Sequence, residues 1–265
     1  LETGKTALKT KIVTPGLVIR ETPVGENDKL LAILTAENGL IRAFADGARR
    51  IKSKNAAATS LLSYCTFTLY KAKDTYKVTD AVVIDLFFEL RYDLEGLALA
   101  QYFCELALRQ VPEGQHNAVF LRLLLNALFL VMHHKRPFEL IKAVYELRFA
   151  AEAGYMPDLL GCSVCQKEQD GRFYFDYKEG CLFCSGCRRG NGGFGAYLNN
   201  TVLCAMRHIL YAPFQKIFSF TVPPADLNLL SDCCEKYLST QTESHYKTLE
   251  FYRSVCMKQE NNDDK

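Results

Sequence analysis

Two pairs of cysteines constrain the fold of this chain more than any other feature of its sequence. Cys162 and Cys165 form one C-x-x-C pair, Cys184 and Cys187 form a second, and residues 166–183 lie between them. Two residues between cysteines allow a tight turn to direct both sulfurs at one ion. Four thiolates fill a tetrahedral shell and leave no position for water, so the spacing predicts a structural zinc site, one ion per chain, rather than a catalytic one. A redox dithiol or a metal-free cluster is the alternative.

Cys181 leaves the ligand set open, because Cys181-x-x-Cys184 has the same spacing. We favour Cys184 with Cys187, since Gly186 between them suits the turn. A strand over residues 172–176 would bring the second pair back to the first. The chain has 11 cysteines, an odd number, and no secretory signal, which favours a reducing, cytoplasmic environment over a disulfide framework.

The overall composition is that of a globular protein. Of the 265 residues, 49% are hydrophobic and 23% charged, and 32 basic residues nearly balance 30 acidic ones. Any charged binding surface must therefore be local. The apolar stretch 123–132 is much shorter than the roughly 20 residues of a membrane span, so we expect a soluble chain. The first residue is Leu1 rather than Met, and we expect residues 1–13 to be a leader or a remnant of a segment added for expression.

Residues 14–88 have the texture of a small β-domain. Asn38-Gly39 is a hairpin signal, because both residues tolerate positive φ. Apolar and polar residues alternate along 61–70, which is typical of a strand with one buried face. Five strands are predicted, over residues 17–19, 30–34, 40–44, 61–70 and 76–84. Five short strands in this length predict a small closed barrel of the OB or SH3-like kind.

Helical periodicity follows the predicted barrel. Three amphipathic segments open near Leu90, Phe120 and Pro137, and the third stops at Gly154. Further helices are predicted over residues 199–212, 224–239 and 242–257. The fold class is therefore α+β: the barrel (14–88), a mainly helical domain (89–158 and 196–258), a zinc-binding insert within it (159–195), and a frayed tail (259–265).

A basic loop lies between the third and fourth predicted strands. Its four cations are Arg49, Arg50, Lys52 and Lys54. On a barrel, such a loop beside an open strand face can contact phosphates without sequence preference. Further cations and tyrosines could extend the surface: Lys29, Arg42, Lys71, Lys73, Lys77, Tyr64, Tyr70 and Tyr76. Charge runs are also common in loops that merely face solvent, and tyrosines are ordinary strand residues, so both interpretations stay open.

Signatures of catalysis are missing from the sequence. No H-E-x-x-H motif is present, nor an H-x-E motif ahead of P-C-x-x-C. Gly4-Lys5-Thr6 imitates the end of a phosphate-binding loop but lacks its strand and first glycine. We therefore expect no catalytic residues and no enzyme activity.

Several segments resemble the RecO family of bacterial recombination mediators. They are Thr14 to Arg20, Gly25 to Leu31, Thr35 to Ile41 and the loop Gly47 to Lys54, and the later cysteine pairs resemble the zinc module of the zinc-bearing members. The resemblance implies an N-terminal OB-fold, a helical domain and an inserted zinc module. Lys54 stands where the family has arginine, which keeps the charge but loses the bidentate fork. Cys181 stands where the family usually has a second glycine.

The resemblance also implies a function in DNA repair by the RecF pathway. Members bind single- and double-stranded DNA and anneal complementary strands without ATP. With RecR they load RecA onto strands coated by single-strand-binding protein (SSB), so the expected partners are DNA, RecR, SSB and indirectly RecA, in the cytoplasm at the nucleoid. Arg49, Arg50, Lys52 and Lys54 would contact phosphates, and Lys29 and Arg42 would extend that surface. The helical domain would carry the pocket for the SSB tail.

Two other classes of function are alternatives. A zinc-dependent DNA-processing enzyme would need an open metal position or a carboxylate cluster, and the sequence shows neither. A protein-interaction adaptor would bind partners through the zinc module and helices, with the basic loop merely solvated. DNA binding by the purified chain separates the adaptor from the mediator.

Overall fold

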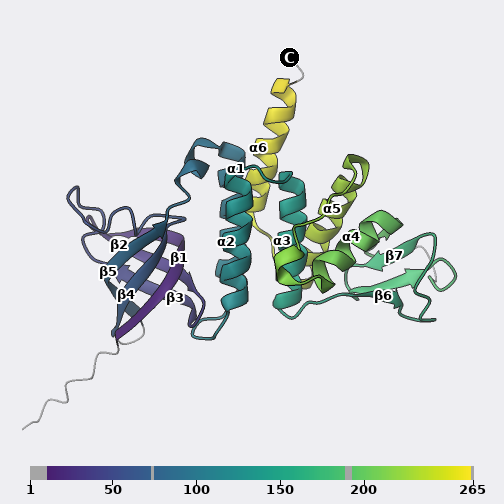
Figure 1. Cartoon of the computed structure of the whole chain (residues 1–265), viewed down its shortest axis with the longest axis horizontal. Helices are drawn as coiled ribbons and strands as arrows, with labels where there is room; N and C mark the ends of the chain where they lie inside the picture. Colours follow the sequence, from purple (N-terminus) through teal and green to yellow (C-terminus); the bar gives the residue numbers. More distant parts are fainter. Residues whose placement is uncertain (1–10, 73–74, 189–192, 264–265) are drawn as a thin grey trace, which may run out of the picture. The chain divides into compact units, whose positions relative to one another are not determined.

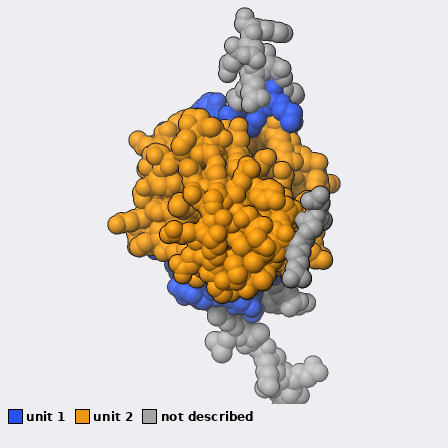
Figure 2. Space-filling view, turned by 90° about the vertical axis from the view of Figure 1, so that its right-hand side faces the viewer, with its two compact units in different colours: residues 1–128, 254–265 blue, residues 129–253 orange. Residues whose placement is uncertain are grey.

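The computed structural model describes residues 11–72, 75–188 and 193–263. The chain divides into two compact units, which Figure 2 colours separately. Residues 1–128 with 254–265 form the first unit, and residues 129–253 form the second.

Among the described residues, no helix has both the length and the apolar character that crossing a membrane requires.

The first unit contains a closed five-stranded barrel of OB-like topology, as predicted (Figure 1). Its strand order is β1-β2-β3-β5-β4; β3 and β5 run parallel, and the other neighbours are antiparallel. The strands are β1 (Lys11–Val24), β2 (Asp28–Thr35), β3 (Gly39–Ala45), β4 (Tyr64–Ala72) and β5 (Thr75–Asp85).

The alternating pattern of β4 places one face of the strand on the barrel core. Cys65, Phe67 and Leu69 are fully buried, whereas the residues between them are partly exposed. Gly39 forms the predicted turn between β2 and β3 with a φ of 57°. A Cβ at this position would lie 2.5 Å from the carbonyl oxygen of Pro112, so only glycine fits.

The barrel begins earlier than the sequence boundary suggests. β1 starts at Lys11, which pairs with Tyr70 of β4, and Ile12 packs against the barrel core. Residues 11–13 therefore belong to the first strand rather than to a leader, because Ile12 gains burial there. The rest of the predicted leader, residues 1–10 with Gly4-Lys5-Thr6, lies outside the described residues.

The predicted helices are all present. They are α1 (Leu94–Gln110), α2 (Ala118–Met132), α3 (Phe138–Glu152), α4 (Asn200–Tyr211), α5 (Pro224–Gln241) and α6 (Lys247–Asp263), with short 3-10 helices η1 (Phe88–Tyr92) and η2 (Phe214–Lys216). Asp93 caps α1 by accepting from the Gly96 amide at 3.0 Å. α1 packs on β1, and α1 and α2 up to Leu128 group with the barrel, whereas the sequence pattern groups them with the later helices. α6 continues to Asp263, into the segment expected to be a tail.

The second unit contains a four-stranded sheet, here called the cysteine module (residues 158–198). Its strands are β6 (Asp158–Cys162), β7 (Phe173–Asp176), β8 (Cys181–Cys184) and β9 (Gly195–Leu198), in the order β6-β8-β7-β9. β7 is the strand expected between the cysteine pairs. α3 packs on α5, and α4 contacts α3, α5, β6 and β9. One face of the sheet meets this helical layer: the ring of Phe175 lies 5.1 Å from that of Tyr237 of α5.

Candidate functional site

The cysteine module brings the two C-x-x-C pairs together. The sulfurs of Cys162, Cys165, Cys184 and Cys187 all lie within 4.8 Å of one another, and the Sγ atoms of Cys165 and Cys184 are 3.6 Å apart. Cys162 ends β6 and Cys184 ends β8, and a tight turn follows each. In one turn the Gln166 amide donates to the Cys162 carbonyl at 2.9 Å, and in the other the Cys187 amide donates to the Cys184 carbonyl at 3.1 Å.

This donor set fits a tetrahedral metal ion. Four sulfurs at about 2.3 Å from a zinc ion are about 3.8 Å from one another, which is close to the spacing in the cluster. Burial alone would raise the pKa of the Cys162 thiol, but backbone amides at Cys165, Cys184 and Val164 lower it to about 6. Hydrogen bonding to the sulfurs of Cys165 and Cys184 raises the pKa of Cys187 to about 12. The cluster could hold a metal ion, which would favour deprotonation of all four thiols.

Cys181 lies outside the four-sulfur cluster, within the part of the chain that the structure describes. Its side chain is half-buried and hydrogen-bonds Ser163, and burial raises the pKa of its thiol. Because side chains alternate along β8, Cys181 and Cys184 point to opposite faces of the strand. The four-sulfur cluster therefore contains Cys184 together with Cys187 rather than with Cys181.

The basic loop is attached to the turn between β1 and β2. The Arg49 amide donates to the Asn27 carbonyl at 2.9 Å, and its guanidinium donates to the Gly25 carbonyl at 3.0 Å. The Gly47 amide donates to Asp28 Oδ1 at 2.7 Å. These bonds fix the start of the loop, so Arg49 has a structural role besides its charge.

The six predicted phosphate contacts differ in availability. Arg50 and Lys52 are exposed, and neither makes an ion pair with any described residue. Lys54 pairs with Asp80 at 3.1 Å and Arg42 with Glu113 at 2.8 Å, both on the surface. Such exposed pairs contribute about 1 kcal/mol or less, so a phosphate could compete for either cation. Lys29 is 15% exposed, pairs with Glu21 and donates to the Thr59 carbonyl, which makes it the least available.

The lysines and tyrosines predicted to extend this surface are mostly paired, partly buried or outside the described residues. Lys77 pairs with Asp46, and Lys73 lies outside the described residues. Tyr76 packs against the barrel core, and Tyr64 and Tyr70 are half-buried. Lys71, Tyr76 and Arg42 together line a small pocket of about 290 Å³.

Ile51 is a residue that sequence reasoning passed over. It lies between Arg50 and Lys52 and is 103% exposed, as fully as a side chain can be. Exposing a large apolar side chain to water is unfavourable, because its surface is not removed from solvent. Apolar side chains of DNA-binding proteins can insert between bases. The signal in the sequence was an isolated isoleucine within a run of cations.

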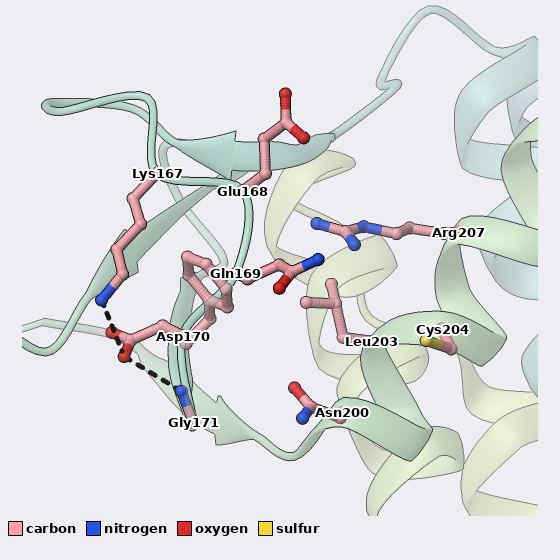
Figure 3. Close-up of a pocket in the computed structure, with 10 residues that line it drawn as sticks. Lys167, Glu168, Gln169, Asp170, Gly171, Asn200, Leu203, Cys204 and Arg207 are labelled. Atoms are coloured by element: carbon pink, nitrogen blue, oxygen red, sulfur yellow. Dashed lines mark hydrogen bonds and ion pairs between the residues drawn. The ribbon is translucent and has the colours of Figure 1, made fainter.

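A pocket of about 620 Å³ lies between the loop 167–171 and helix α4 (Figure 3). Asn200, Leu203, Cys204 and Arg207 line it from the helix side. The Arg207 guanidinium donates to the carbonyls of Leu159 at 2.7 Å and Leu160 at 2.8 Å, so it joins α4 to β6. None of the predicted site residues lines this pocket.

The comparisons with known proteins cover both units. Residues 10–87 match the family described as Recombination protein O N terminal, and residues 91–250 match Recombination protein O C terminal. A DNA repair protein RecO of Acetivibrio thermocellus is 31% identical over 243 residues, covering 91% of this chain and 96% of that protein. One of Alkaliphilus metalliredigens is 30% identical over 92% of this chain and 99% of that protein. The chain therefore belongs to the RecO family.

Proposed function

We propose that this chain is a DNA repair and recombination mediator that binds single- and double-stranded DNA through its basic loop and anneals complementary strands without ATP. With RecR it would help to load RecA onto strands coated by SSB. The observation that carries the proposal is the pair of exposed cations, Arg50 and Lys52, which lack acidic partners among the described residues on a loop held against an OB-like barrel. Its relatives are named DNA repair proteins, which supports the same role.

The proposed mechanism is electrostatic. Two DNA strands repel each other through their phosphates, and cations that replace the counterions of both strands lower this repulsion. Arg50 and Lys52 would contact phosphates first. Lys54 and Arg42 would then leave their ion pairs with Asp80 and Glu113 and bind phosphates instead. Bases then find their complements by pairing, which requires no nucleophile and no nucleotide hydrolysis.

We also propose that the four thiolates of the cysteine module hold one zinc ion. The ion would stabilise the insert, since four cysteine ligands leave no coordination position for substrate or water. Elemental analysis of the purified chain tests this directly. About one zinc per chain is expected, and a value well below one would contradict the site.

The first experiment is annealing of two complementary labelled oligonucleotides by the purified chain without ATP, across a series of salt concentrations. We expect annealing that weakens steeply with salt, because the contacts are to phosphates. Absence of both annealing and DNA binding at low salt, with binding to RecR or SSB retained, would favour a protein-interaction adaptor instead. Strand cleavage that depends on added divalent metal would favour a DNA-processing enzyme.

The basic loop is tested by reversing the two charges that have no acidic partner among the described residues, Arg50→Glu with Lys52→Glu. We expect weaker binding to all DNA sequences alike, together with slower annealing. The control for a single charge reversal is Lys236→Glu, an exposed position on α5 far from the barrel in sequence. Arg49→Glu with Arg50→Glu should weaken binding as well, but it also removes the Arg49 bonds to the β1–β2 turn. Unchanged affinity of both loop variants at moderate salt would refute the assignment of the loop.

A further inference from the structure

Three aromatic side chains form a row across the face of the cysteine module that points away from α5. Tyr174 of β7 is directly opposite Phe183 of β8 on one side and Tyr197 of β9 on the other. Directly opposed residues of antiparallel strands lie on the same face of a sheet, so the three rings are neighbours. The rings of Tyr174 and Tyr197 are 5.4 Å apart in an edge-to-face arrangement. The alternate residues Phe173 and Phe175 fill the opposite, buried face.

Two arginines lie over this aromatic row. The guanidinium carbon of Arg188 is 3.6 Å from the ring centre of Tyr174 and 4.8 Å from that of Tyr197. The guanidinium carbon of Arg172 is 5.6 Å from the ring centre of Tyr197. Arg188 also donates to the Tyr197 hydroxyl. Neither arginine pairs with a carboxylate among the described residues, so the face carries two cations that are not neutralised locally.

Among the described residues, two polar atoms of this cluster have no hydrogen-bond partner. Tyr174 is 5% exposed, and its buried hydroxyl has no hydrogen-bond partner in the part of the chain that the structure describes. The Nε of Arg188, whose guanidinium covers the Tyr174 ring, is also buried and has no partner among residues 11–72, 75–188 and 193–263. A buried polar group without a partner destabilises the folded state, so such groups call for an explanation. The cluster therefore has both a donor and a hydroxyl that an incoming ligand could bind.

We propose that this face is a base-stacking platform for unpaired DNA. Aromatic rings on a sheet stack bases, and arginines beside them stack on bases and bind phosphates. Tyr197 is 44% exposed at the edge of the row, where the first base would stack. The Arg188 guanidinium would then turn from the Tyr174 ring to a phosphate. This inference rests on the proposed function, because it adds a second DNA contact to that of the basic loop.

Unpaired DNA is the occupant that this chemistry favours. Two guanidinium groups without acidic partners among the described residues attract a polyanion, and the exposed ring of Tyr197 beside them offers a surface on which a base can stack. A DNA duplex with its bases paired can offer phosphates to the arginines but cannot stack bases on the rings. Preference for single strands is therefore the property that this face would supply.

The experiment measures binding of the full-length, metal-loaded chain to a fluorescent oligothymidylate and to an abasic oligonucleotide of equal length. The abasic strand keeps the phosphates and lacks the bases. For Tyr197→Ala, we expect binding to oligothymidylate to weaken about five-fold or more, because stacking contributes about 1–3 kcal/mol per base, with no change for the abasic strand. Tyr197→Phe should bind like the wild type, since it keeps the ring. Tyr92→Ala, which removes an exposed tyrosine of the other unit, is the matched control.

A second variant, Arg172→Gln, keeps the test decisive if Tyr197→Ala does not fold. It lies at the exposed edge of the row, and we expect weaker binding of both oligonucleotides, because it removes a phosphate contact. Wild-type chain that fails to bind either strand at low salt would overturn the proposed function itself. Wild-type binding that Tyr197→Ala and Arg172→Gln leave unchanged, with native zinc content, would overturn the platform and leave the basic loop standing.

Discussion

Lys142 is a buried lysine on α3 whose charge is neutralised by two carboxylates. Its ammonium lies 3.0 Å from Glu146 of the same helix and 2.7 Å from Glu235 of α5. Removing the cation leaves the carboxylates buried without it, so we expect Lys142→Met to lower the free energy of unfolding by about 3–5 kcal/mol. Urea denaturation measures this. Lys236→Met, an exposed lysine on α5, should change it by less than about 1 kcal/mol. Equal effects of the two variants would contradict the prediction.

Glu235 should make stability depend on acid pH. Burial alone would raise the pKa of Glu235, but Lys142 and Arg253 hold it below the ordinary 4.5. A carboxyl whose pKa is lowered by folding stabilises the folded state above its unfolded pKa, and this stabilisation is lost as pH falls through the folded pKa. The wild type should therefore lose more unfolding free energy than Glu235→Gln between about pH 6 and about pH 3. Parallel pH profiles of the two proteins in urea denaturation would argue against this.

At the scale of elements, the cysteine module should depend on its metal, whereas the barrel should not. β6 and β8 each end at a cysteine ligand of the predicted site, so losing the ion would release both knuckle turns. We expect Cys165→Ser to lose zinc and to increase amide hydrogen exchange across residues 158–198, with β1–β5 unchanged. Cys204→Ser, an exposed cysteine on α4, should keep both the zinc and the protection. Unchanged exchange in a metal-free Cys165→Ser chain would contradict the prediction.

Elements with a strong local signal could be predicted from the sequence. The alternation along β4 and the turn glycine Gly39 predict the barrel, because burial and positive φ leave direct marks on residue type. β9 was not predicted from the sequence, because its first residue, Gly195, ends a glycine-rich stretch that resembles a loop. A Cβ at Gly195 would lie 2.0 Å from the Phe175 carbonyl oxygen, so this glycine serves close strand pairing instead.

The candidate site likewise has features that the sequence predicts and features that only the fold reveals. The spacing of the cysteine pairs points to the cluster, yet only the fold separates Cys181 from it. The row of Tyr174, Phe183 and Tyr197 comes from three strands, and its register depends on pairings that have no local mark in the sequence. The availability of the loop cations likewise depends on distant acids such as Asp80 and Glu113.

At the scale of the whole molecule, the near balance of charge makes DNA binding a local property. The chain has a formal net charge of only +2, so its overall field attracts DNA weakly and the salt dependence should report individual contacts. Each phosphate contact on a single strand contributes about 0.7 to the slope of log affinity against log salt. For Arg50→Gln with Lys52→Gln we therefore expect a slope shallower by about 1.4, measured by fluorescence anisotropy with one labelled oligonucleotide. Lys236→Gln has the same charge change per residue on α5 and should leave the slope unchanged. A loss of about 0.7 in that control, half the loss expected for the double variant, would mean that net charge, and not the basic loop, governs binding.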